Sequence, residues 1–141
     1  MQTRLNAEKI APDAMKIMKG LEEYIRNSGL EPTLLELIRT RASQINGCAY
    51  CLHMHTHDAR VKGETEARLY LLNAWRESPL HNDRGWTEAV TLISQTHAPD
   101  ETYDEARRHF SEAELVNLTL AVATINAWNR LAISFRVSPK V

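Results

Sequence analysis

Residues 32–61 have the sequence PTLLELIRTRASQINGCAYCLHMHTHDARV and predict two helices joined by a short turn. Pro32 is expected to open the first helix, whose apolar side chains recur at helical spacing as far as about Asn46. Asn46-Gly47 should break this helix. The second helix is expected over about Cys48–Val61. The turn between them therefore places both cysteines of the chain at the start of the second helix.

Helical periodicity and capping signals extend on both sides of this pair. Ile10, Ala14, Ile17, Leu21 and Ile25 follow helical spacing and predict a first helix. The expected features of the remaining chain are a Gly29 stop after that helix, helices near residues 64–73, 86–96, 103–109 and 112–135, a loop from Ser78-Pro79 and a helix start at Asn82-Asp83. This pattern predicts an all-α helical bundle.

The last predicted helix has the clearest boundaries. Ser111 and Glu114 have the spacing of a capping box, in which each side chain accepts a hydrogen bond from an otherwise unpaired backbone N–H. The stretch Leu115–Trp128 is apolar on most sides. A helix with this composition is expected in the core or at a subunit interface.

Composition and charge restrict the function classes. The 141 residues are enough for one domain, expected over residues 1–141, and 43% of them are hydrophobic. Seventeen basic residues face eighteen acidic ones, so no basic excess is available for binding nucleic acid or an anionic membrane. No apolar run is long enough to span a bilayer, and the first residues do not resemble a signal peptide. We therefore expect a cytoplasmic protein.

The two cysteines form the motif Cys48-Ala49-Tyr50-Cys51. A bridge between them would close too small a loop to stabilise the fold much. Two thiols this close in a cytoplasmic protein more often carry out redox chemistry or bind a metal.

A helical projection selects one histidine as a partner of these thiols. At 100° per residue, Cys48, Cys51 and His55 fall within an arc of about 60°. His53 and His57 fall on the opposite side, so they are expected at the surface or at an interface. The start of a helix also favours thiolate over thiol, and a histidine can exchange a proton near neutral pH. The sequence thus predicts a dithiol equipped for proton-coupled redox chemistry.

Glu36-Leu37-Ile38-Arg39 together with Cys48, Cys51 and His55 resembles the core motif of the alkylhydroperoxidase D family, within the carboxymuconolactone decarboxylase superfamily. The family pattern has a Glu twelve residues before the first Cys, then CxxC, then a His four residues after the second Cys, and this sequence matches every position. The resemblance covers about residues 15–75, and residues 124–130 are also similar to single-domain, peroxidase-related members.

The resemblance implies an antioxidant thiol peroxidase with an all-α, oligomeric fold. By this resemblance Cys51 is oxidised by a hydroperoxide to a sulfenic acid, while Cys48 donates a proton and then closes the disulfide. Glu36 and His55 belong to a proton relay. The resemblance also implies a homo-oligomer, a trimer or a hexamer, and a dithiol or lipoyl partner as reductant. No metal or organic cofactor is expected.

Two features complicate the assignment of the family's residue roles to this sequence. The best-known family members carry a histidine at the position of Tyr50. A tyrosine hydroxyl generally titrates at much higher pH than an imidazole. Tyr50 could pack in the core or line a pocket. The helix dipole favours Cys48 as the more acidic thiol, because Cys48 is nearer the helix end, whereas the resemblance assigns attack to Cys51.

Several residues also have ordinary structural interpretations. Taken alone, Glu36 continues a polar stripe with Thr40 and Ser43 and would be solvated. Arg39 and Arg41 are expected to form ion pairs. The three tryptophan rings, Trp75, Trp86 and Trp128, are expected to pack rather than to bind a ligand.

Three alternative functions use the same region. Cys48, Cys51, His55 and Glu36 could together bind zinc, although structural zinc sites usually draw on two separated ligand pairs. A lyase of the decarboxylase type would not need the CxxC dithiol. A thiol–disulfide sensor or oxidoreductase would use the same cluster, with any peroxidase activity incidental.

Overall fold

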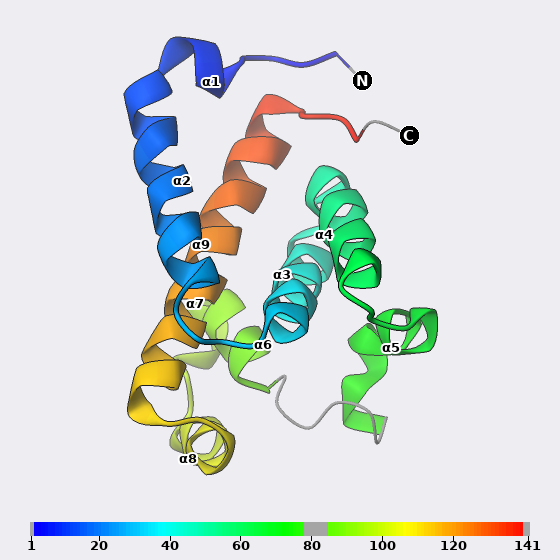
Figure 1. Cartoon of the computed structure of the whole chain (residues 1–141), viewed down its shortest axis with the longest axis vertical. Helices are drawn as coiled ribbons and strands as arrows, with labels where there is room; N and C mark the ends of the chain where they lie inside the picture. The colour runs from blue at the N-terminus through cyan, green and yellow to red at the C-terminus, as the bar shows by residue number, and fades with distance from the viewer. Residues whose placement is uncertain (1, 78–84, 140–141) are drawn as a thin grey trace.

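The structure is a computed structural model that describes residues 2–77 and 85–139, and the regular elements among these residues are all helical. This confirms the predicted all-α fold (Figure 1). The elements are α1 (Ala7–Ile10), α2 (Pro12–Arg26), α3 (Pro32–Asn46), α4 (Ala49–Val61), α5 (Glu66–Tyr70), the 3₁₀ segment η1 (Leu72–Glu77), α6 (Gly85–Thr91), α7 (Ile93–Thr96), α8 (Asp100–His109) and α9 (Glu112–Phe135).

Helix α3 lies at the centre of the bundle, where it packs against α4, α6, α9 and η1. Its apolar side chains face two ways. Leu35 and Ile38 join a buried cluster with Leu118 and Val122 of α9, and Leu37 packs in a second cluster under α4 and α5. Burying an aliphatic side chain of this size stabilises a fold by about 1.5–3 kcal/mol. The core therefore fixes α3 relative to both α4 and α9.

The turn between α3 and α4 has the predicted position. Gly47 adopts a left-handed conformation with φ of 70°, which a glycine reaches without steric cost. The N–H of Cys48 then donates to the carbonyl of Ser43 at 3.0 Å. Cys48 is the N-cap residue of α4, so the predicted break and the predicted helix start are both confirmed.

The first predicted helix differs from the periodic pattern. The chain forms α1 and α2 with Ala11 between them, and α2 ends at Arg26, before Gly29. Ile17 is 75% exposed and Ile10 is also exposed, whereas Met15 is buried. Because the helix is interrupted at Ala11, Ile10 does not continue the buried side of α2.

Other boundaries shift in smaller ways. The helix expected near residues 64–73 is the short α5 followed by η1, and the one expected near 86–96 is divided at Leu92 into α6 and α7. Helix α8 begins at Asp100, earlier than expected. The loop predicted from Ser78-Pro79 and the helix start predicted at Asn82-Asp83 lie outside the described residues.

Helix α9 has the predicted capping box. Glu114 Oε2 accepts from the N–H of Ser111 at 2.8 Å, and Ser111 Oγ accepts from the N–H of Glu114 at 3.2 Å. Most of the apolar middle of α9 is buried, but Val116 and Ile133 remain exposed. None of the helices in residues 2–77 and 85–139 has the length and hydropathy to cross a membrane.

Candidate functional site

Cys48 and Cys51 form a disulfide bond at the N-terminus of α4. The N–H of Cys51 also donates to Cys48 Sγ at 3.4 Å, so a sulfur atom caps the helix. Both residues are buried, and they pack against Ala42 of α3 and Ile125 of α9. A sulfur in this position lies beside the unpaired N–H groups of the first helical turn, which stabilise a negative charge.

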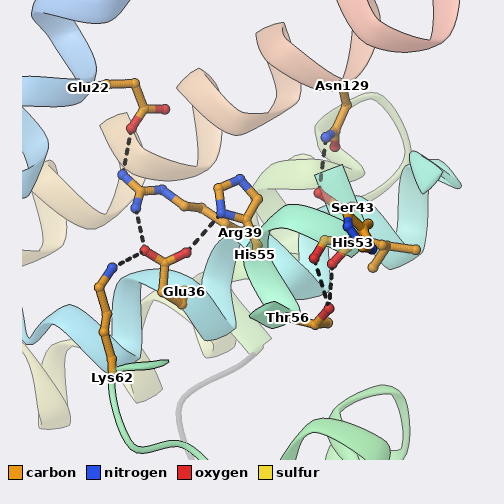
Figure 2. A network of polar contacts seen from close by, with 10 residues as sticks. Glu22, Glu36, Arg39, Ser43, His53, His55, Thr56, Lys62 and Asn129 are labelled. Atoms are coloured by element: carbon orange, nitrogen blue, oxygen red, sulfur yellow. Dashed lines mark hydrogen bonds and ion pairs between the residues drawn. The ribbon is translucent and has the colours of Figure 1, made fainter. Parts of the chain in front are cut away.

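A network of asparagines supports the turn that carries the disulfide. Asn46 Nδ2 donates to Oδ1 of Asn126 at 2.9 Å and to Oδ1 of Asn129 at 2.8 Å. Asn129 is fully buried, and its Nδ2 donates to Ser43 Oγ at 3.0 Å (Figure 2). These bonds connect the last turn of α3 to α9. They hold the segment that leads directly into Cys48.

His55 is the buried histidine of α4, one turn after Cys51. His53 and His57 are exposed, as the helical projection predicts. Residues four apart on a helix are side-chain neighbours, so the imidazole and the second sulfur lie on the same face of α4.

Glu36 lies opposite this face on α3 and is 2% exposed. Its two oxygens have different partners (Figure 2). Oε2 lies 2.8 Å from His55 Nδ1. Oε1 accepts from Arg39 Nη1 at 3.0 Å and from Lys62 Nζ at 2.5 Å. Arg39 in turn pairs with Glu22 of α2 at 2.5 Å. The acidic group is thus held by three cation-forming side chains.

These contacts determine the charge of Glu36. Burial raises the pKa of the Glu36 carboxyl, but the hydrogen bonds from His55 and Lys62 and the charge of Arg39 outweigh burial and lower the pKa to about 2. An ionised carboxylate can only accept hydrogen bonds, so His55 Nδ1 carries the hydrogen in this contact. In the neutral imidazole, Nε2 is then the nitrogen that can take up a proton.

A cavity of about 1200 Å³ opens beside this cluster. Cys51, His55 and Glu36 line it, whereas Cys48 does not. Helices α2, α4 and α9 surround it, and its apolar wall includes Tyr50, Met54, Trp128, Leu131 and Phe135. Tyr50 therefore both packs against the cysteine cluster and lines the cavity, and Trp128 is a lining residue as well as a packing residue.

Both ends of the described chain reach the same cavity. Thr3 and Leu5 line it from the N-terminal segment, and Phe135 and Val137 line it from the other end. The N–H of Arg4 donates to the carbonyl of Phe135 at 2.9 Å, which ties the two segments together. Figure 1 shows the segment before α1 and the segment after α9 at the same end of the bundle.

The two arginines that lie between Glu36 and Cys48 in the sequence have different ion-pair partners. Arg39 contacts Glu36 and belongs to the site. Arg41 pairs with Glu88 of α6 at 2.5 Å, and that carboxylate also accepts from Trp75 Nε1 at 2.7 Å. Both arginines therefore form the expected ion pairs, but only Arg39 does so with Glu36.

The sequence interpretation missed Lys62 and Asp58. Both were within reach of the projection that selected His55, because at 100° per residue they fall at about 320° and 280° from Cys48, on the same side of the helix. Asp58 also lies near the acidic group: ligand atoms of Glu36, His55 and Asp58 are all within 4.8 Å of one another. Their spacing from Cys48 is thus a sequence signal for both residues, although neither is a cysteine or a histidine.

The geometry does not favour the predicted alternative of a four-ligand zinc site. The sulfurs of Cys48 and Cys51 are bonded to each other, so neither is a thiolate in this state. Glu36, His55 and Asp58 are close enough to share a cation. However, Arg39 and Lys62 already place two positive charges on Glu36 Oε1, and these would repel a metal ion.

Comparison with known proteins identifies the family. The family model of the carboxymuconolactone decarboxylase family matches residues 12–93, which include Glu36, both cysteines and His55. The chain belongs to this family, and the resemblance seen in the sequence is confirmed. The chain is also 43% identical over 139 residues to the uncharacterized protein YdfG of Bacillus subtilis (strain 168), covering 95% of both chains.

Solved structures share the fold. A protein of unknown function from Agrobacterium tumefaciens, whose name suggests an antioxidant defence protein AhpD, is 43% identical over 99% of both chains with a TM-score of 0.95. The debrominase Bmp8 is 20% identical, with a TM-score of 0.77 over 92% of this chain and 73% of its own. A peroxidase-related protein from Silicibacter sp. TM1040 is also 20% identical, with a TM-score of 0.78 over 92% of this chain and 71% of its own.

Proposed function

We propose that this protein is an antioxidant thiol peroxidase that reduces hydroperoxides with the Cys48–Cys51 dithiol. The observation that carries the proposal is that Cys51 lines a large cavity together with His55, whose Nδ1 contacts an ionised, buried Glu36. A cysteine sulfur, an imidazole and a cavity that could admit a substrate thus occur together, which supports the proposal. The likeness to the Agrobacterium protein supports the same activity.

The reaction consumes two electrons from the dithiol. His55 Nε2 takes the proton of the Cys51 thiol, and the thiolate attacks the distal oxygen of the hydroperoxide. The O–O bond breaks, the leaving alkoxide takes the proton of Cys48 and departs as the alcohol, and Cys51 becomes a sulfenic acid. The Cys48 thiolate then attacks Cys51 Sγ, the leaving hydroxide takes the proton from His55 Nε2 and departs as water, and the disulfide of the present structure forms.

The position of each sulfur supports this division of roles. Cys51 lines the cavity, so a substrate there can reach it, whereas Cys48 packs between α3 and α9. Proximity to the helix end favours a charged Cys48. A charged Cys48 is suited to the second step, in which it attacks the sulfenic acid. Access, rather than acidity, therefore assigns the first step to Cys51.

The cycle also needs a reductant and a quaternary structure. We expect a dithiol protein or a lipoyl carrier to restore the thiols by exchange with the disulfide. By the family resemblance we also expect a cytoplasmic homo-oligomer, a trimer or a hexamer, whose mass light scattering would measure.

The first prediction tests the chemistry by thiol titration. The reduced protein receives one equivalent of cumene hydroperoxide, and free thiols are counted before and afterwards. The chain has two cysteines, so the parent should lose both thiols for each hydroperoxide. Cys48→Ser should lose one thiol and form a sulfenic acid that dimedone traps. Cys51→Ser should consume no hydroperoxide.

The two cysteine variants are matched controls, because they differ only in which sulfur remains. Consumption of hydroperoxide by Cys51→Ser at the parent rate would contradict the proposal. Rapid exchange of the disulfide with a reduced dithiol protein, combined with no response to hydroperoxide, would favour the sensor or oxidoreductase alternative.

A further inference from the structure

Lys62 shares a carboxylate with the proposed base. It is the C-cap residue of α4, seven residues after His55. Its ammonium lies 2.5 Å from Glu36 Oε1, while His55 Nδ1 lies 2.8 Å from Oε2. The side chain of Lys62 is 37% exposed, whereas that of Arg39 is 6% exposed. Lys62 is therefore a cation of this cluster that can be replaced without opening the core.

The charges around His55 favour opposite forms of the imidazole. Glu36 and Asp58 both face it and stabilise the protonated form. Arg39 and Lys62 counter this by neutralising Glu36, and Glu22 already engages Arg39. The α9 residues that line the cavity are all non-ionisable. The ionisable lining residues come from other elements: Glu8 of α1, Lys19, Glu22, Glu23 and Arg26 of α2, Glu36 and Arg39 of α3, Tyr50, Cys51, His55 and Asp58 of α4, and Lys62.

We propose that Lys62 is a positioning residue: by holding and neutralising Glu36, it favours the neutral imidazole of His55, which is the form that can act as a base. The role of base rests on the proposed function. Lys62 acts through Glu36 and does not touch the reacting atoms. The step it governs is the transfer of one proton from Cys51 Sγ to His55 Nε2. Nothing is oxidised or reduced in this step.

Removal of the Lys62 charge gives a result of known sign. Without the ammonium, less positive charge offsets the negative charge of Glu36 and Asp58. Their carboxylates then stabilise the protonated form of His55 more strongly. The midpoint of the His55 titration in the variant should therefore lie at a higher pH than in the parent. Arginine at the same place keeps the charge and should keep the midpoint.

The test follows the His55 ring protons by NMR during a pH titration of the disulfide form, in which the cysteines do not titrate. The variants are Lys62→Met, Lys62→Arg and, as a control, Lys16→Met, which removes an exposed lysine of α2 that does not line the cavity. We expect an upward shift in Lys62→Met alone. His55→Gln identifies the signal.

Peroxide kinetics give a second readout. On the reduced enzyme, the rising limb of the pH profile of kcat/KM should move upward in Lys62→Met and stay in place in Lys62→Arg. A His55 midpoint that is unchanged in Lys62→Met, or that shifts equally in Lys62→Arg, would overturn the inference. A parent without peroxidase activity would overturn the proposed function instead, and the NMR titration would still decide the role of Lys62.

Discussion

Glu36 remains charged in a buried position because its partners compensate for the loss of water. Isolated buried carboxylates prefer the neutral form, since charge is costly in a low-dielectric interior. Here Lys62, Arg39 and His55 supply hydrogen bonds and positive charge to both oxygens. The same contacts that set the tautomer of His55 thus connect the site to the stability of the fold.

The second prediction concerns this link between acid and stability. The pKa of Glu36 is lowered to about 2 from an ordinary value of 4.5. A depressed pKa contributes stability above pH 4.5, and this stability is lost as the pH falls from about 4.5 toward 2. Between pH 5.5 and pH 3 the parent should lose about 2 kcal/mol more free energy of unfolding than Glu36→Gln, as urea denaturation at both pH values would measure. Equal losses would show that the carboxylate is not stabilised by its partners.

At this scale the sequence predicted some features and missed others. The choice of His55 over His53 and His57 followed from helical geometry, which depends only on residue spacing. The burial of Glu36 did not follow, because its neighbours Thr40 and Ser43 are polar and suggested an exposed stripe. These two residues are buried as well, since α3 is covered by other helices on several sides.

The turn between α3 and α4 is the element that joins the helix of Glu36 to the helix of the cysteines and His55. Gly47 reverses the chain, and the asparagine network on α9 holds the end of α3 in place. Signals for the turn are local, so Asn46-Gly47 was sufficient to predict it. The partners in α9 are about 80 residues away in sequence, and periodicity carries no information about such pairs.

The third prediction tests the support given by Asn129. Asn129→Ala removes one of the two acceptors of Asn46 and the amide that donates to Ser43 Oγ, and it should lower the free energy of unfolding by about 1–3 kcal/mol. Asn117→Ala is a matched control on the same helix, because Asn117 accepts a hydrogen bond from the exposed Tyr24 hydroxyl. The control should lose less than about 1 kcal/mol in urea denaturation. Similar losses in both variants would assign no special role to the network.

Helix boundaries were predicted well where capping signals are strong. The start at Ser111 and the break at Gly47 agree with the structure, because each rests on a specific hydrogen bond or backbone conformation. The division of residues 85–96 at Leu92 was not predicted. No glycine or proline marks that position, so the local sequence gives no signal for the break.

The cavity is a property of the whole molecule. Its walls come from the N-terminal segment, α2, α3, α4 and the end of α9, which are distant in sequence. Local sequence patterns therefore indicate the candidate site residues but not the cavity that they line. It also assigned Trp128 to packing alone, because a ring on an apolar helix gives no sign of a nearby void.

The fourth prediction concerns access through the N-terminal segment. Deletion of residues 2–10 removes the lining residues Thr3, Leu5, Asn6, Ala7 and Glu8. In the Cys48→Ser background, the reaction of Cys51 with the bulky reagent DTNB should accelerate several-fold more than its reaction with the small reagent iodoacetamide. The ratio of the two rates is the measured quantity. Equal acceleration of both reactions would indicate general loosening of the fold rather than a wider entrance.

The position of the chain ends at the cavity has a practical consequence for handling the protein. A purification tag fused to either end would start close to the cavity wall formed by Thr3 and Val137. A polyhistidine tag would bring extra imidazoles and any nickel they carry to the cavity that Cys51 lines. Kinetic work should therefore use protein from which the tag has been cleaved.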